Sequence, residues 1–388
     1  MNPRMNLRTL LVVIMIIGIG AACAPAAVTS PTAIPTAAKP AASTTQAPVA
    51  ATAPAKATEK PAEKPAPTFA PASVKFGGTG NTAWSTVYVA LEKGYFKEQG
   101  IDLELVNFNS SSEIVSPLAT GQLEVGGLSL SLALLQAIDR GLDLKIVAPS
   151  STSNTIPNAK TSSDYVWMML RKDLADSGKV KTPADLKGMK IAIPSKGSHG
   201  DQTAQLMLEQ AGLKAEDVEI TVMPTSNVAV AFGNKGIDVA YATEPQVALN
   251  LQQGLATKWI PASSYFGGKT VTTILGYGPA ILKNPDVARR FMVAYMKGAR
   301  TYMKALTTGE GRDEVVNILI KHTQVKDAAI YNLMSLPSVD VNGVVDLENI
   351  RLQYQWLVDQ GLYKGKKTFD DATDTSFAQY AVQQLGKQ

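Results

Sequence analysis

VKFGGTGNTAWSTVYVALEKGYFKEQGIDLELVNF, which spans residues 74–108, predicts the fold. Val74-Lys75-Phe76 is typical of a short strand and ends at two glycines, and a helix pattern follows over residues 86–98 until Gln99-Gly100. Over residues 101–108, apolar side chains alternate with Asp, Glu and Asn, as in a strand with one buried face. The stretch is therefore a strand, a helix and a second strand.

The same unit recurs along the chain. Thr182-Pro183 is a typical helix start, a hydroxyl cap followed by Pro at the first position. Repeated strand–helix units of this length predict an α/β fold with parallel, doubly wound sheets, followed by a helical last third. Further strands are expected at residues 125–128, 144–148, 165–171, 189–194, 217–223, 237–242 and 270–277, and helices at 114–120, 131–140, 201–211, 286–307, 312–322, 327–334, 347–360 and 375–385.

The composition narrows the function classes. A chain of 388 residues with 45% hydrophobic and 18% charged residues is globular and has room for two lobes plus extensions. The net charge of +4 is mild, and no Arg/Lys stripe interleaved with aromatics is present, so no nucleic-acid partner is expected. One cysteine excludes an internal disulfide, and two distant histidines are a poor zinc ligand set. We therefore expect no metal and no cofactor.

The first 22 residues are typical of an export signal. Arg4 and Arg8 accompany an apolar or small stretch at residues 10–22, which is shorter than the roughly 20 residues of a bilayer span. The stretch ends in Gly20-Ala21-Ala22-Cys23, which resembles a bacterial lipoprotein cleavage site, although that pattern usually has Leu where Gly20 stands. Cys23 is thus expected to become an acylated N-terminus; the alternative is an anchor helix with an incidental cysteine. Either reading places the mature protein at the outer face of the membrane.

Residues 23–72 are predicted to be a disordered tether. Apart from a few residues they contain only Ala, Pro, Thr, Ser, Lys and Glu. Such a segment cannot bury enough apolar surface to offset the entropy of ordering, and frequent Pro keeps it extended. The folded part is expected to begin near Ser73.

Four motifs carry a family resemblance. They are YVALEKGYFKEQGID at residues 88–102, LATGQLEVG at 118–126, TPADLKGMKIA at 182–192 and GIDVAYATEP at 236–245. Their sequence and order resemble the sulfonate, nitrate and thiamine-precursor binding proteins of ABC importers, over about residues 73–276.

The resemblance implies a two-lobed type II periplasmic binding protein, hinged by two crossing strands. The lobes would comprise residues 73–172 (first part of lobe 1), 173–268 (lobe 2) and 269–388 (return to lobe 1 and C-terminal helices). It further implies a monomeric carrier, lipid-anchored at the extracytoplasmic face of the cell membrane. Its partners would be a small-molecule solute and the permease and ATPase subunits of the importer.

Strand ends predict where a solute would bind. Doubly wound sheets bind ligands beyond the carboxyl ends of their strands, where loops and helix N-termini meet. Two such sheets facing each other make a cleft that a hinge can close. The loops expected there are residues 79–84, 107–112, 129–131 and 150–153 in one lobe and 195–201, 224–227 and 241–244 in the other.

Eight side chains in these loops are candidate ligand contacts, each with a structural alternative. They are Trp84, Ser110, Ser129, Ser198, His199, Asn227, Tyr241 and Glu244. Trp84 would stack on a planar solute or pack against the next helix. Glu244 would accept hydrogen bonds from ring N–H groups or serve as a first-turn acid at a helix N-terminus. The three serines and Asn227 would bind solute or cap helices, His199 would bind solute or face solvent, and Tyr241 would bind solute or pack on its sheet.

The loop composition favours one solute class. Sulfonate and nitrate call for fixed positive charge or a fan of N–H donors, yet Lys196 is the sole cation in these loops. Abundant hydroxyls, aromatics and an acid favour a flat polar heteroaromatic, such as a riboflavin-like flavin or a thiamine-type pyrimidine. An oxyanion is the alternative. An enzyme that makes a vitamin pyrimidine is the alternative of another class, but its cysteine-rich iron site has no counterpart here, so no catalytic residue is expected.

Overall fold

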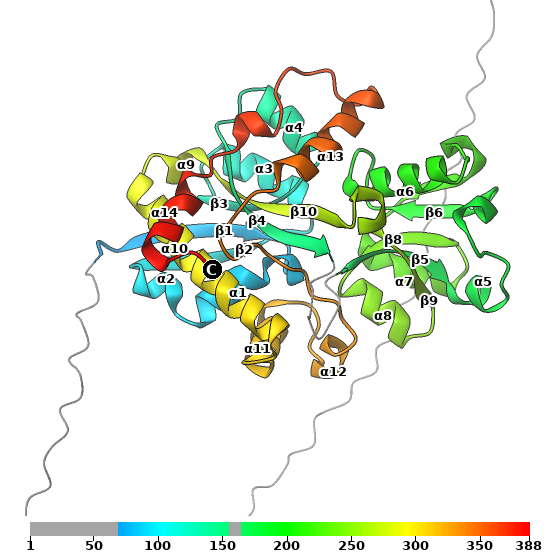
Figure 1. The fold of residues 1–388 in the computed structure, drawn as a ribbon, viewed down its shortest axis with the longest axis horizontal. Helices are drawn as coiled ribbons and strands as arrows, with labels where there is room; N and C mark the ends of the chain where they lie inside the picture. Colours follow the sequence, from blue (N-terminus) through cyan, green and yellow to red (C-terminus); the bar gives the residue numbers. More distant parts are fainter. Residues whose placement is uncertain (1–68, 155–163) are drawn as a thin grey trace, which may run out of the picture. The chain divides into compact units, whose positions relative to one another are not determined.

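The computed structural model describes residues 69–154 and 164–388, which belong to one compact unit, Lys64–Gln388. The predicted signal segment, most of the tether and Cys23 lie outside the described residues and stay predictions. Two five-stranded sheets form the framework (Figure 1). Within the described residues no helix combines the length and apolar character needed to cross a membrane.

The first sheet has the strand order β2-β1-β3-β10-β4 and the second β7-β6-β8-β5-β9. The strands of the first are β1 (Ala72–Gly78), β2 (Ile101–Asn107), β3 (Val125–Ser129), β4 (Lys145–Asn154) and β10 (Lys269–Tyr277). Those of the second are β5 (Val166–Arg171), β6 (Lys190–Ile193), β7 (Glu219–Val222), β8 (Val239–Thr243) and β9 (Ala256–Pro261). Each sheet with its helices is called a lobe below, and the predicted two-lobed α/β fold is confirmed.

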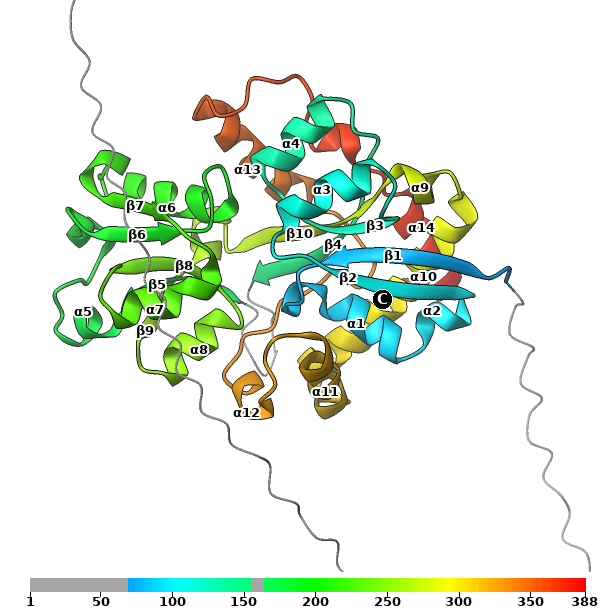
Figure 2. The same ribbon diagram turned by 180° about the vertical axis from the view of Figure 1, so that it is seen from behind.

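Helices cover both faces of each sheet (Figures 1 and 2). In the first lobe one core joins the sheet to α1, α10 and α14, and a second core joins it to α3, α4 and α13. The described helices are α1 (Ser85–Glu92), α2 (Tyr95–Glu98), α3 (Ser111–Ala119), α4 (Leu132–Asp139), α5 (Lys172–Asp176), α6 (His199–Gln210), α7 (Val228–Gly233), α8 (Gln246–Gln252), α9 (Pro279–Leu282), α10 (Pro285–Thr307), α11 (Arg312–His322), α12 (Ala328–Tyr331), α13 (Leu347–Asp359) and α14 (Ser376–Leu385).

The sheets are mixed rather than wholly parallel, which corrects the expectation. Strand β10 runs antiparallel to β3 and β4, and β5 runs antiparallel to β8 and β9. Each reversed strand is the one by which the chain arrives from the other lobe, so it enters its sheet from the opposite side. Because β5 already belongs to the second sheet, the chain enters that lobe before Val166 rather than at the boundary expected after residue 172.

Local details differ from the predicted elements in several places, among them α12 (Ala328–Tyr331), which is shorter than the helix expected over residues 327–334, and α5 and α9, which were not predicted. The helix expected over residues 86–98 is broken into α1 and α2 at Gly94, which adopts a φ of 75°. Strand β4 continues to Asn154, well beyond the predicted end at residue 148. Strand β9 was not predicted at all. The helix start at Thr182 exists as a capping box on a short 3-10 turn, Pro183–Leu186.

The beginning of the folded body is fastened by one buried arginine. Arg290 of α10 is 4% exposed, and its Nη1 donates to the carbonyl oxygens of Ala70 and Gln99 at 3.3 and 2.6 Å. Its guanidinium also lies over the ring of Phe69, 5.1 Å from the centroid. Strand β1 follows at once and pairs in parallel with β2 from Ala72 to Gly78. The residues just before β1 are therefore part of the fold.

Helix α10 packs unusually close to α1. A Cβ added to Gly298 would lie 2.5 Å from the carbonyl oxygen of Thr86 and 2.7 Å from the Cβ of Ala90. Only a residue without a side chain permits this approach. The contact holds α1, which follows the first strand end, firmly against the body of the first lobe.

Candidate functional site

The carboxyl ends of strands from the two lobes meet at one backbone contact. The N–H of Leu132, at the start of α4, donates to the carbonyl oxygen of Gly197 at 3.4 Å. Gly197 lies between β6 and α6, has a φ of 67°, and would place a Cβ 3.0 Å from that of Leu132. The loops after β3 and β6, both expected near a solute, are thus neighbours.

Hydroxyl groups gather at the strand ends of the first lobe. Ser129, at the end of β3, donates through Oγ to the Oγ of Ser111 at 3.1 Å. Ser110 occupies the N-cap position of α3 without capping it, since its Oγ donates to Glu113 Oε1 at 3.2 Å. Ser131 is the residue that caps α4, by accepting from the N–H of Leu134. Ser129 is thus paired with Ser111, a residue next to Ser110 that sequence reasoning did not single out.

Trp84 is a fully buried part of the first lobe. Its Nε1 donates to Thr79 Oγ1 at 2.9 Å, and its ring meets Phe76 edge-on at a centroid distance of 5.8 Å. A Cβ on Gly127 would lie 2.7 Å from the indole, so the ring packs directly on the backbone of β3. The contacts described for the ring are with β1 and β3 and not with the following helix, and stacking on a solute stays a prediction.

Two hydroxyls near Trp84 are buried without a partner. Within the described residues, Thr82 Oγ1 and Thr86 Oγ1 find no hydrogen-bond partner, and both side chains are 1% exposed. Leaving a buried hydroxyl unpaired costs about 1–3 kcal/mol. Both threonines lie in the first turns after β1, at the end of the sheet where ligands bind doubly wound folds.

His199 and Tyr241 are brought together in the second lobe. The ring of His199 is 7% exposed and lies within hydrogen-bond distance of two hydroxyls, Nδ1 at 3.0 Å from Tyr241 and Nε2 at 2.8 Å from Thr270. It also stacks on Phe266 at 4.7 Å. Burial lowers the pKa of His199 from 6.5 to about 3, so the ring is neutral at physiological pH. Because Thr270 belongs to β10, His199 ties the start of α6 to a hinge strand.

Glu244 is buried between three segments. It is 2% exposed; Oε2 accepts from the N–H of Ala248 at 2.9 Å and Oε1 from the N–H of Ser335 at 3.0 Å. Burial raises the pKa of Glu244 from 4.5 to about 7, while the two N–H groups and the charge of Lys258 oppose the rise. The carboxylate thus stabilises the first turn of α8 and also holds a segment 91 residues away. Acceptance of a solute N–H by Glu244 stays a prediction.

The two remaining candidates differ in exposure. Ser198 is the N-cap of α6: its Oγ accepts from the N–H of Asp201 at 3.3 Å and donates to the carbonyl oxygen of Ser195 at 2.6 Å. Asn227 is exposed and makes no side-chain cap on α7, although Ser226 Oγ donates to its Oδ1 at 3.4 Å. Helix capping accounts for Ser198 but not for Asn227.

The hinge holds a cluster of buried hydroxyls that sequence reasoning missed. Ser151 of β4 makes hydrogen bonds with Tyr165 at 2.7 Å and with Thr272 of β10 at 2.9 Å, and Thr273 and the Tyr165–Thr272 pair complete the network. These residues lie just before β5 and in the two strands that cross between the lobes. The serine run at residues 150–153 was the one sequence signal for this cluster, since its partners come from distant strands.

A family model agrees with this architecture. The model described as "NMT1/THI5 like" matches residues 81–305, more than half of the chain. The chain belongs to the NMT1/THI5 like family.

Three known proteins are similar to this chain. The "Putative binding protein BAB2_1146" of Brucella abortus (strain 2308) is 29% identical over 249 residues, which is 63% of this chain and 70% of that protein. The 4-amino-5-hydroxymethyl-2-methylpyrimidine phosphate synthase THI11 of Saccharomyces cerevisiae is 26% identical over 231 residues, 56% of this chain and 63% of the yeast protein. The alkanesulfonate-binding protein SsuA from Xanthomonas axonopodis pv. citri, solved with MOPS, matches with a TM-score of 0.62 at 18% identity, covering 79% of this chain and 99% of SsuA.

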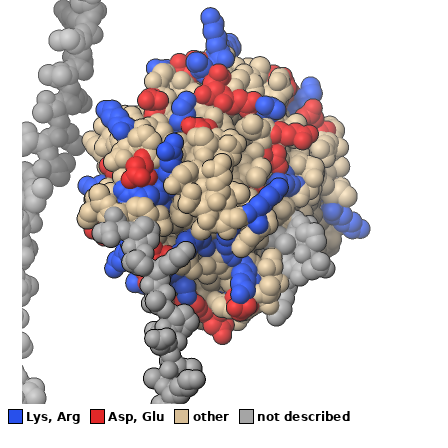
Figure 3. All heavy atoms as spheres, turned by 60° about the vertical axis from the view of Figure 1, so that its left-hand side comes forward, with Lys and Arg blue, Asp and Glu red and all other residues tan. Residues whose placement is uncertain are grey.

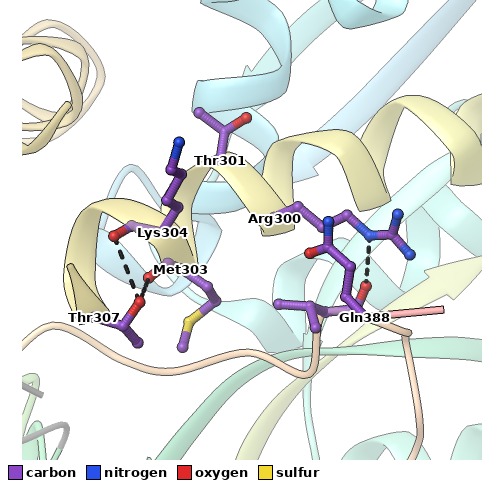
Figure 4. A pocket seen from close by; sticks show the side chains of 7 residues that line it. Arg300, Thr301, Met303, Lys304, Thr307 and Gln388 are labelled. Carbon is purple, nitrogen blue, oxygen red and sulfur yellow. Dashed lines mark hydrogen bonds between the residues drawn. The ribbon is translucent and has the colours of Figure 1, made fainter. Parts of the chain in front are cut away.

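A separate hollow of about 430 Å³ in this NMT1/THI5 like chain lies on α10 and the C-terminal residues (Figure 4). Arg300 donates there to the carbonyl oxygens of Val341 and Leu385, at 3.2 and 3.0 Å. The hydroxyl of Thr307 donates to the carbonyl oxygen of Met303 at 2.9 Å. Main-chain oxygens therefore already accept from these donors of Arg300 and Thr307.

Lys, Arg, Asp and Glu side chains are interspersed over the face shown in Figure 3. Among residues 69–154 and 164–388 no group of three or more His, Cys, Asp or Glu residues is arranged to hold a metal ion.

Proposed function

We propose that this protein is an extracytoplasmic solute-binding lipoprotein of an ABC importer, which captures a small solute between its lobes and delivers it to the permease. The observation that carries the proposal is the hinge. Two lobes, each with hydroxyl-bearing loops at its strand ends, are joined by β4 and β10 and touch where Leu132 meets Gly197. The likeness to SsuA and the Brucella binding protein supports it.

The solute we propose is a flat, polar heteroaromatic such as a flavin or a vitamin pyrimidine. The strand-end loops offer the hydroxyls of Ser110, Ser129 and Ser198, and Lys196 is the one cation in the expected loops. Neutral donors and acceptors of this kind suit ring nitrogens and carbonyl oxygens, which hydroxyls can serve in either role. His199, Tyr241 and Glu244 would then hold the loops in position, because their polar atoms already have protein partners.

An oxyanion is the second solute class that we retain. SsuA is named for alkanesulfonate, and hydroxyls with backbone N–H groups can hold such a group without a fixed cation. Thermal unfolding with riboflavin, 4-amino-5-hydroxymethyl-2-methylpyrimidine, MOPS and nitrate separates the classes. A solute at 100 times its dissociation constant stabilises the folded state by about 2.7 kcal/mol, whereas a non-ligand leaves the melting temperature unchanged.

Ser129→Ala is the variant that tests the site, with Ser177→Ala on the exposed end of α5 as its control. Loss of one hydrogen bond to the solute should weaken binding by about fivefold in Ser129→Ala, measured by titration calorimetry. Ser177, whose Oγ donates to the carbonyl oxygen of Leu174, is remote from the strand-end loops. Equal affinities in the two variants would remove Ser129 from the site.

A catalytic role is favoured by one observation, the 26% identity to the yeast pyrimidine synthase. A carrier returns its solute unchanged and in the amount bound, whereas a synthase of that kind forms a new pyrimidine. Mass spectrometry of the denatured protein and its supernatant after incubation with candidate substrates distinguishes the two. A new pyrimidine product would overturn the carrier assignment.

The membrane anchor is tested separately from binding. In a bacterial expression host, Cys23→Ala should shift the protein from the membrane fraction to the soluble fraction, because the acyl chains would have no attachment site. Metabolic labelling with a fatty acid should mark the parent chain alone. A variant that stays at the membrane would contradict acylation of Cys23 and favour the anchor-helix alternative.

A further inference from the structure

A short segment outside the two hinge strands also connects the lobes. This segment, residues 335–339, is called the strap. At its beginning, Ser335 contacts the second lobe twice: its N–H donates to Glu244 Oε1 at 3.0 Å, and its Oγ accepts from Lys258 Nζ of β9 at 3.2 Å. Lys258 in turn lies over the ring of Trp167 of β5, 5.4 Å from the centroid. The strap therefore begins on a charged pair of residues from the second lobe.

The other end of the strap is held by the first lobe and by the hinge. The hydroxyl of Tyr302 on α10 donates to the carbonyl oxygen of Pro337 at 2.8 Å. Ser338 and Thr152 of β4 exchange both backbone hydrogen bonds, at 3.0 and 2.8 Å, in an antiparallel bridge. Within the four residues 335–338, the strap thus contacts the second lobe, α10 of the first lobe and the hinge strand β4.

The strap is packed into the core. Met334 and Leu336, which flank Ser335, are each 2% exposed and belong to the apolar core that joins the first sheet to α1 and α10 and that also includes Ala248 of α8 in the second lobe. A rotation of the second lobe must therefore either separate Ala248 from this core or pull the strap out of its contacts with α10 and β4. Since burial also excludes water from the Glu244–Ser335 hydrogen bond, breaking it leaves a buried carboxyl oxygen and a buried N–H unpaired.

We infer that the strap is a third crossing between the lobes and that Glu244 and Lys258 form its latch, which must release Ser335 before the lobes can rotate about β4 and β10. The inference deepens the proposed carrier function and rests on it for its physiological meaning. The latch itself would limit the rotation of the lobes whether or not a solute is present.

Distance measurements between spin labels test the latch. The full chain carrying Cys23→Ser has no other cysteine, so Lys97→Cys in the first lobe and Gln210→Cys in the second, both exposed, give one labelled pair. Glu244→Gln keeps the size of the side chain but replaces one of the two accepting oxygens by an NH2 group, which cannot accept from the N–H of Ser335 or Ala248. Glu209→Gln, an exposed glutamate on α6, is the matched control.

The latch predicts a wider or longer inter-lobe distance distribution in Glu244→Gln than in Glu209→Gln, without added solute. Amide hydrogen exchange at Ser335 should be at least about tenfold faster, since a hydrogen bond to a charged acceptor is lost. Lys258→Met, which keeps a long apolar side chain, should change the distances in the same direction. Distance distributions that superimpose for all three variants would overturn the latch. Failure of every solute to bind would instead count against the proposed function alone.

Discussion

Neutral His199 should make the folded state sensitive to acid. Its pKa is lowered from 6.5 to about 3 by burial, so the unfolded chain binds a proton between these two pH values that the folded chain does not. Stability from this group is fully present above pH about 6.5 and is lost as the pH falls towards 3. With a slope of about 1.36 kcal/mol per pH unit, lowering the pH from 7.5 to 4.5 should cost the folded state about 3 kcal/mol.

The perturbation that isolates this effect is His199→Gln. Glutamine offers a donor and an acceptor to Tyr241 and Thr270, but it does not titrate. Urea unfolding at four pH values between 7.5 and 4.5 gives the free energy of unfolding of both proteins. A constant offset at all pH values reports only the lost packing on Phe266. We expect the advantage of the parent chain to shrink by about 3 kcal/mol at pH 4.5, and two parallel pH curves would refute a neutral buried histidine.

Three further outcomes are expected. Glu244 should affect the pH dependence of stability in the opposite sense: because its pKa is raised from 4.5 to about 7, its contribution to the free energy of unfolding is present below pH 4.5 and lost as the pH rises to 7. In urea unfolding, the stability of Glu244→Gln relative to the parent should therefore rise by about 3 kcal/mol between these pH values. An unchanged difference would contradict the burial argument. Arg290→Met should make the start of β1 accessible to limited proteolysis, because the hydrogen bonds to Ala70 and Gln99 are lost. Arg289→Met, at the exposed neighbouring position, should not. Equal cleavage of the two variants would show that Arg290 does not hold the start of β1 in place. Gly298→Ala should destabilise by about 1–3 kcal/mol in thermal unfolding, because its Cβ would meet the Thr86 carbonyl oxygen at 2.5 Å, and a neutral effect would mean that α10 can shift.

The sequence predicted the elements whose signals are local. The period-two pattern of residues 101–108 became β2, and the long amphipathic stretch became α10. Strand β4 was predicted too short because Pro149 and the serines after it are typical of a loop, and they form a strand through pairing with β10, more than a hundred residues away. Strand β9 was missed because its pairing with β5, not its own composition, makes it a strand.

In the candidate site, too, local features could be predicted from the sequence and long-range contacts could not. The strand-end position of all eight candidates follows from local patterns, and the structure brings His199 to Tyr241 and Ser110 close to the Ser111–Ser129 pair. Their hydrogen-bond partners do not follow, since Thr270 and Ser335 are 71 and 91 residues from the side chains that they contact. Of the side chains that suggested solute contact, Glu244 meets a partner 91 residues away, whereas the Nε1 of Trp84 donates to Thr79, five residues away.

The hydrogen bonds of Arg290 to Ala70 and Gln99 also affect how the folded domain resists a pulling force on its N-terminal end. A pull on the chain before residue 69 acts along the axis of β1, whose seven residues all pair with β2. Such a load shears every hydrogen bond of the ladder at once rather than opening them one after another. Such a pull would therefore break the hydrogen bonds of Arg290 to Ala70 and Gln99 before it separates β1 from β2.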